Sequence, residues 1–244
     1  MDATLPAGDC SSGADPVPIC CRRSLQSAGV TTLPPAYRWT FAGFLAIVVV
    51  SWWRPIHPAE QALHHSLTVL ALIALFQLMR RTRLPYASFC LILIFLTLHT
   101  IAARWIYSFV PYDDWTQALF GVRLGESLGW QRNHFDRLVH FAYGACLGPV
   151  FLRYLVTERG WRIRWSALLT VDVVLSTSAL YELFEWGIAM TLAPGAAEAY
   201  NGQQGDLWDA QKDMTFATIG ALLTVTALAV ILHSRSMERA PSHV

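Results

Sequence analysis

The sequence predicts an all-α polytopic membrane protein, a bundle of about six transmembrane helices with both termini in the cytoplasm. Hydrophobic residues make up 54% of the 244 residues and charged residues only 14%, against about 25% charged in a typical soluble domain. The mean hydropathy is +0.37. This balance excludes an ordinary soluble domain, and the length suits one helical bundle with tails. We expect the lipid bilayer as its partner, and no nucleic acid.

Six apolar stretches are candidates for crossing a hydrocarbon core of about 30 Å, which takes about 20 helical residues. The stretches are 37–53, 62–79, 85–106, 137–157, 165–191 and 213–232. Backbone polar groups have no water partner in lipid, so each stretch must be a helix, since the alternating pattern of a barrel strand is missing. The sequence therefore predicts a membrane domain over residues 37–232.

The two predicted tails flank this domain at residues 1–36 and 233–244. The first is rich in Pro, Ser, Gly and Ala, and it cannot bury enough apolar surface to order itself. We expect it to be a disordered cytoplasmic tail. Three of the five cysteines, Cys10, Cys20 and Cys21, lie in it, and neither a disulfide framework nor a structural zinc spacing follows from the pattern.

The charges predict the orientation. When the connections are assigned alternately to two sides, one side receives 12 of the 18 basic residues. These are Arg22, Arg23, Arg38, Arg80, Arg81, Arg83, Arg153, Arg159, Arg162, Arg164, Arg235 and Arg239. By the positive-inside rule this side is cytoplasmic. The opposite, outer side receives 11 of the 17 acids, so we expect the chemistry there.

The first polar motif lies near the outer end of the fourth stretch. Asp136, His140 and Tyr143 recur at i, i+4 and i+7 and share one helical face. Gly144 beside them permits a close helix neighbour. Ionisable groups at membrane depth cost roughly 2.5 to 3.5 kcal/mol each, so a chain that keeps several of them is using them. The alternative is that Asp136 only caps the helix and His140 is satisfied against it.

The second motif is a pair of carboxylates, Glu182 and Glu185, near the outer end of the fifth stretch. Carboxylates one turn apart repel each other, so in a low dielectric they must bind a cation, share a proton or pair with bases. The alternative is an ion pair that only fixes helix packing, with Lys212, Arg137 or Arg104 as the base.

The third motif opens the last stretch. Asp209 and Asp213 are four residues apart and face the same way, with Lys212 between them. Acids in a first turn also complement the helix dipole. For Asp206, a good N-cap, this structural explanation is preferred to a functional one, whereas for Asp213 it is less sufficient.

Three segments carry a family resemblance. They are Arg132-Asn-His-Phe-Asp-Arg-Leu-Val-His-Phe-Ala-Tyr-Gly144, Tyr181-Glu-Leu-Phe-Glu-Trp186 and Gln204-Gly-Asp-Leu-Trp-Asp-Ala-Gln-Lys-Asp-Met214. With these the chain resembles the YjdF-like family of bacterial inner-membrane proteins, a domain of unknown function, from about residue 40 to 232. The resemblance implies a multi-pass protein of the bacterial inner (plasma) membrane. Val139 and Tyr143 stand where the family usually has Gly and Gln.

A more distant resemblance joins 136–143, Glu185 and 213–220 to VanZ-like membrane proteins, which are associated with glycopeptide-antibiotic tolerance. Ala217 stands where that family usually has Asn. Neither family brings an established reaction.

The three motifs together predict an outward-facing carboxylate and histidine pocket. Its candidates are Asp136, Arg137, His140, Glu182, Glu185, Asp209, Lys212 and Asp213. We expect it to bind a cation or an envelope component, such as a lipid-linked or cell-wall intermediate. The candidate metal ligands are His140, Glu182, Glu185, Asp209 and Asp213. Carboxylates favour Mg²⁺, Mn²⁺ or Ca²⁺, and a histidine adds Zn²⁺.

Two other functions stay open. One is a proton- or cation-coupled carrier, against which all strong acidic motifs lie on one side. The other is a structural membrane protein whose polar cluster only docks helices. The chain lacks the signatures of an intramembrane serine protease, a His-Glu-x-x-His metalloprotease or a CDP-alcohol transferase, so whether it is an enzyme stays open.

Overall fold

A computed structural model describes residues 33–191 and 202–238, with side chains to residue 234. Every element in these two ranges is a helix. The helices are α2 (Pro35–Ser51), α3 (Pro58–Arg81), α4 (Tyr86–Arg104), α5 (Tyr112–Phe120), α6 (Leu124–Ser127), α7 (Phe135–Arg153), the π-helical turn η1 (Tyr154–Glu158), α8 (Ile163–Ala189) and α10 (Asp209–Glu238). The predicted all-α class is confirmed.

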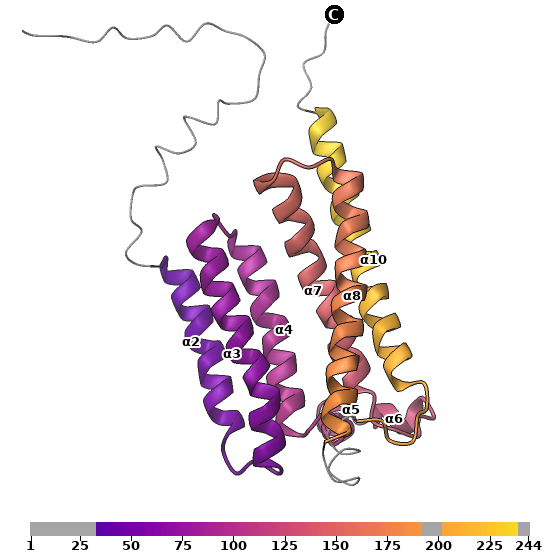
Figure 1. The fold of residues 1–244 in the computed structure, drawn as a ribbon. Coiled ribbons are helices and arrows are strands. Elements are labelled where there is room, and N and C mark those ends of the chain that lie inside the picture. Colours follow the sequence, from indigo (N-terminus) through magenta and orange to yellow (C-terminus); the bar gives the residue numbers. More distant parts are fainter. Residues whose placement is uncertain (1–32, 192–201, 239–244) are drawn as a thin grey trace, which may run out of the picture.

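Five helices of the described residues are long and apolar enough to cross a membrane: α3, α4, α7 continued by η1, α8 and α10. The first predicted stretch forms α2, whose 17 residues fall short of the usual length of about 20. The long helices follow each other up and down the bundle, so α2 starts and α10 ends at the same end (Figure 1). This agrees with the predicted placement of both termini on one side.

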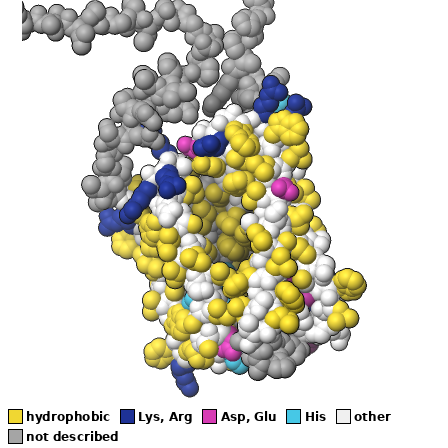
Figure 2. Space-filling view, in the orientation of Figure 1, with side chains coloured by type: hydrophobic (Ala, Val, Ile, Leu, Met, Phe, Trp, Pro, Cys, Tyr) yellow, Lys and Arg dark blue, Asp and Glu magenta, His cyan; other side chains and the backbone are white. Residues whose placement is uncertain are grey.

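The arrangement of charge follows the same division. Figure 2 shows Lys and Arg side chains mostly at the end where α2 starts and α10 ends, with hydrophobic side chains over the middle of the bundle. The opposite end carries the connection between α4 and α7, which contains α5 and α6 (Figure 1). These two short helices were not predicted, since neither is an apolar stretch.

The described residues form three hydrophobic clusters. Phe44, Leu75, Phe89, Leu93 and Leu96 form one core among α2, α3 and α4. A second joins the end of α4 and the turn after it to the start of α7, through Ala102, Tyr107 and Phe135. The third lies where α7, α8 and α10 meet.

The α7–α10 pair is the most extensive helix contact described, and glycine makes its close approach possible. A Cβ placed on Gly144 would overlap the backbone carbonyl of Ala217, and one on Gly220 would overlap the carbonyl of Phe141. The close neighbour that Gly144 predicts is therefore α10. This contact fixes the outer ends of both helices, which carry the polar motifs.

Candidate functional site

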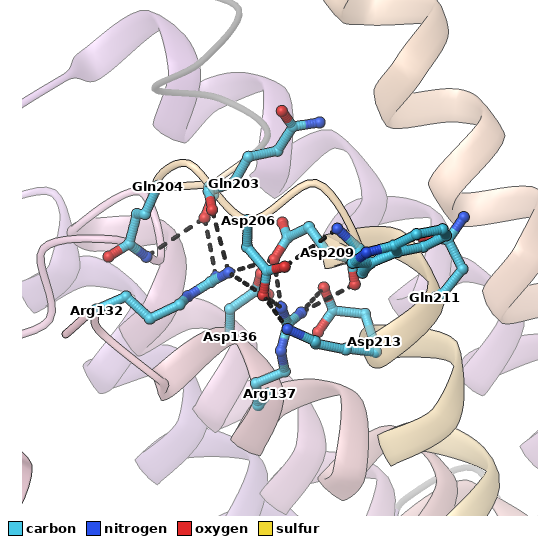
Figure 3. Close-up of polar contacts among 12 residues, drawn as sticks. Arg132, Asp136, Arg137, Gln203, Gln204, Asp206, Asp209, Gln211 and Asp213 are labelled. Atoms are coloured by element: carbon cyan, nitrogen blue, oxygen red, sulfur yellow. Dashed lines mark hydrogen bonds and ion pairs between the residues drawn. The ribbon is translucent and has the colours of Figure 1, made fainter. Parts of the chain in front are cut away.

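The outer ends of α7 and α10 are joined by a network of ion pairs (Figure 3). Arg137 of α7 pairs with Asp209 and Asp213 of α10, and its Nη2 lies 3.3 Å from Asp206 Oδ2. Its Nη1 also donates to the backbone carbonyl of Asp209 at 3.1 Å. Arg132, just before α7, reaches Asp209 Oδ1 at 2.5 Å and Asp206 Oδ2 at 3.4 Å. The network therefore docks α7 onto α10.

The segments that precede α7 and α10 are also joined by hydrogen bonds. Arg132 donates to the carbonyls of Gly202 and Gln203, each at 3.1 Å. The backbone N–H of Asn133 donates to Gln204 Oε1 at 2.8 Å, and Gln204 Nε2 donates back to the Asn133 carbonyl at 3.2 Å. These hydrogen bonds join two segments that are distant in the sequence, and Figure 3 shows Arg132, Gln203 and Gln204 of this contact.

Asp206 is the most exposed acid of this network. Lys212 Nζ lies 2.7 Å from its Oδ2, and this hydrogen bond lowers the pKa of Asp206 to about 2. Its other oxygen accepts the N–H of Trp208 at 3.1 Å, a side-chain turn contact. Because α10 begins at Asp209, Asp206 is not at the N-cap position predicted for it. The ion pairs with both arginines were not expected.

The ionisable residues at the outer ends of α7, α8 and α10 fall into two groups that differ in their balance of charge. Three acids face three bases in the docking network, so this group is balanced. Its members are Arg132, Arg137, Asp206, Asp209, Lys212 and Asp213. Arg132 and Asp206 were missing from the candidates, although both lie in the segments that carried the family resemblance.

The second group surrounds His140, and apart from the Arg137 contact of Asp213 it has no lysine or arginine partner among the described ion pairs. His140 Nε2 lies 3.5 Å from Asp136 Oδ1, 3.8 Å from Glu182 Oε1 and 4.0 Å from Asp213 Oδ1. The three carboxylates come from α7, α8 and α10, so the expected convergence of the three motifs is observed. Asp213 belongs to both groups, because its Oδ2 faces Arg137 and its Oδ1 faces His140.

Two oxygens of this second group are buried without a hydrogen bond. They are Glu182 Oε1 and Asp213 Oδ1, and Asp213 is only 2% exposed. An unsatisfied buried acceptor costs about 1 to 3 kcal/mol, more when charged. Native structures rarely keep one without a water, an ion or a catalytic role to explain it.

Glu185 is not among the described ion-pair partners of His140. With Glu182 and Asp209 it lines a cavity of about 380 Å³ between α8 and α10, and it interacts with Tyr181. The bases proposed as its partners are engaged elsewhere: Arg104 donates to the Arg54 carbonyl at 3.1 Å, while Arg137 and Lys212 belong to the docking network. Among the described ion pairs, none joins Glu182 or Glu185 to a lysine or arginine.

A metal could be held by Asp136, His140 and Asp213, whose ligand atoms all lie within 4.8 Å of one another. A cation with bonds of about 2.0 to 2.6 Å can bridge donors at such spacings after small side-chain movements. This set differs from the expected one. It adds Asp136, whereas Asp209 is occupied by two arginines and Glu185 lines the cavity.

Comparison with known proteins identifies the family of this chain. The family described as "Predicted membrane protein (DUF2238)" matches residues 36–235. The Escherichia coli (strain K12) inner membrane protein YjdF is 35% identical over 188 residues, which cover 74% of this chain and 84% of that protein. No solved structure matches. The YjdF-like resemblance and the inner-membrane location are thereby confirmed, and the VanZ-like resemblance stays a prediction. The chain is a membrane protein that belongs to the DUF2238 family.

Proposed function

We propose that this inner-membrane protein binds a divalent cation between Asp136, His140 and Asp213, and through the cation an envelope component. The observation that carries the proposal is Asp213 Oδ1, a buried oxygen without a hydrogen bond that lies 4.0 Å from His140 Nε2. Docking explains the other oxygen of Asp213, which faces Arg137. It does not explain this one.

Charge supports a cation in this place. The docking network balances three acids with three bases, and the described ion pairs give Asp136, Glu182 and Glu185 no lysine or arginine. Carboxylates that are buried near one another are strongly disfavoured when all are ionised, and a bound cation offsets their charge. One divalent ion offsets two of these three charges.

The donor types narrow the choice of metal. One imidazole nitrogen with two or three carboxylate oxygens suits Zn²⁺ or Mn²⁺ better than Mg²⁺ or Ca²⁺, which prefer oxygen alone. Three protein ligands also leave coordination positions for an outside group, as in catalytic zinc sites. An anionic group of an envelope molecule, such as a phosphate or carboxylate, is the ligand that fits such a position.

Equilibrium dialysis of purified protein in detergent against Zn²⁺ and Mn²⁺ tests the proposal. We expect about one ion per chain, with loss of binding in His140→Gln and Asp136→Asn. Asp172→Asn is the matched control, because Asp172 lies exposed on α8 outside the cluster. Equal metal content in all four proteins, or none in the wild type, would refute cation binding.

Docking is the second candidate function, and the balanced ion pairs favour it for their own six residues. It does not extend to Asp136, His140 and Glu182, which have no such partner among the described ion pairs beyond each other and Asp213. The carrier alternative gains no support from the described residues, because the buried carboxylates gather at one end of the bundle.

A further inference from the structure

A second cavity lies on the other side of His140. It has a volume of about 300 Å³ and lies among α3, α4, α7 and α8. Binding pockets for small molecules start at about this size. α3 and α8 border it from opposite sides and are not among the helix pairs described as packing closely. Figure 2 shows the surface hollowed along the middle of the bundle, within the hydrophobic region.

The lining of the cavity changes from polar to apolar along the length of the bundle. His140, His99 and Tyr181 line it toward the outer end of the bundle. Leu147 and Ala71 line it toward the bilayer centre. From His140 to Leu147 the helix rises about 10 Å. A molecule that fits has a polar group outside and a hydrocarbon part inside, which is the arrangement of a lipid in the outer leaflet.

Two hydroxyls on the wall have no hydrogen bond. They are Thr68 Oγ1 and Ser178 Oγ, on residues that are 4% and 2% exposed. Both residues line the cavity from opposite helices, α3 and α8. Buried hydroxyls normally have a partner, so these two indicate a ligand with hydrogen-bonding atoms between its head and its chain.

The outer end of the cavity is built from a strained turn. Ile106 and Tyr107, after α4, have φ angles of 40° and 58°, which is a true outlier for a β-branched residue such as isoleucine. The turn brings Tyr107 to the cavity wall, where its hydroxyl lies 2.5 Å from His99 Nδ1. Backbone strain of this kind gathers at ligand sites.

We infer that this cavity holds the hydrocarbon chain of a membrane lipid, with the polar head of the lipid beside His140. The chain enters laterally from the bilayer between α3 and α8. A phosphate ester is the head that the proposed cation would hold, and this part alone rests on the proposed function. The envelope component of the proposed function is then a membrane lipid.

Photolabelling tests the inference on the full-length protein in bilayer nanodiscs. The probes are phosphatidylglycerol and a polyprenyl phosphate, each with a diazirine in its hydrocarbon chain, which distinguishes the two sources of a phosphate head. We expect labelled peptides from 139–147 and 177–181. Ala71→Trp fills the cavity and should lower the labelling of these peptides at least five-fold, whereas Val69→Trp, on the exposed face of α3, should leave it unchanged.

A second pair of variants tests the same cavity in case Ala71→Trp does not fold. Thr177→Trp enters the cavity from α8, and Leu180→Trp, which is 64% exposed, is its control. Equal labelling of cavity and control variants by both probes would overturn the inference. Loss of labelling with EDTA would support the phosphate head at the cation. Labelling that responds to Ala71→Trp but not to EDTA would overturn the head assignment and support the chain assignment.

Discussion

Gly144→Ala is the substitution that most directly tests the close packing of α7 on α10. The added Cβ would overlap the carbonyl oxygen of Ala217 and would lie 2.7 Å from the backbone nitrogen of Ala221. The obstacle is backbone on both counts, so no side-chain rotation relieves it. The two helices must move apart or bend.

The size of the effect follows from two opposing contributions. Overpacking a well-packed contact costs typically about 1 to 3 kcal/mol, and we expect the upper part of this range because the neighbour is rigid. Replacing glycine by alanine inside a helix stabilises the helix by about 0.5 to 1 kcal/mol, which offsets part of this cost. The net loss is about 2 kcal/mol. For a chain of this size that lowers the Tm by about 4 to 8 °C.

Thermal unfolding in detergent, followed by intrinsic tryptophan fluorescence, measures this loss. Gly187→Ala is the control, because a Cβ on Gly187 of α8 meets nothing within 4 Å. It should leave the Tm unchanged or raise it slightly. A Gly144→Ala protein as stable as the control would show that α7 and α10 do not approach as described, and the site between them would be refuted with it.

The remaining predictions concern the charges. Arg137→Gln leaves buried carboxylates uncompensated and should cost about 3 to 5 kcal/mol, measured by the same melting assay; a loss under 1 kcal/mol would contradict the docking network. Lys212→Met should remove the largest cause of the low Asp206 pKa, the hydrogen bond from Lys212. Stability from this pair is present above the unfolded-state pKa of about 3.9 and is lost as the pH falls through about 2, so wild-type stability should fall more steeply than that of Lys212→Met between pH 4 and 2. Reporter fusions after Arg81 and Gln203 should localise to opposite sides of the membrane, and two cytoplasmic reporters would refute the topology.

The sequence predicted the helices well because their signal is local. An apolar run too long for any other membrane structure needs no tertiary information. The short helices α5 and α6 were not predicted, because they are neither long nor apolar. They span Tyr112–Phe120 and Leu124–Ser127.

The meeting of the three motifs was also predictable, because isolated charges against lipid are costly and the motifs lie at one membrane depth. Partner choice within the cluster was not. Asp206, Asp209 and Asp213 compete for two arginines, and the outcome depends on how α7 and α10 are rotated about their axes. The spacing of residues in the sequence does not determine how the two helices are rotated relative to each other. The same holds for Tyr143, whose hydroxyl lies 2.6 Å from Thr177 Oγ1, a polar contact between α7 and α8.

The central claim is that Asp136, His140 and Asp213 bind a cation, and a metal titration of the melting temperature tests it most directly. At a metal concentration 100 times the Kd, a single site stabilises by about 2.7 kcal/mol, or about 5 to 11 °C in a chain of this size. We predict such a rise with Zn²⁺ or Mn²⁺ for the wild type and for Asp172→Asn, and none for Asp213→Asn. A wild-type protein that does not respond to either metal, with an Asp213→Asn protein destabilised equally with and without metal, would mean that the cluster only docks helices.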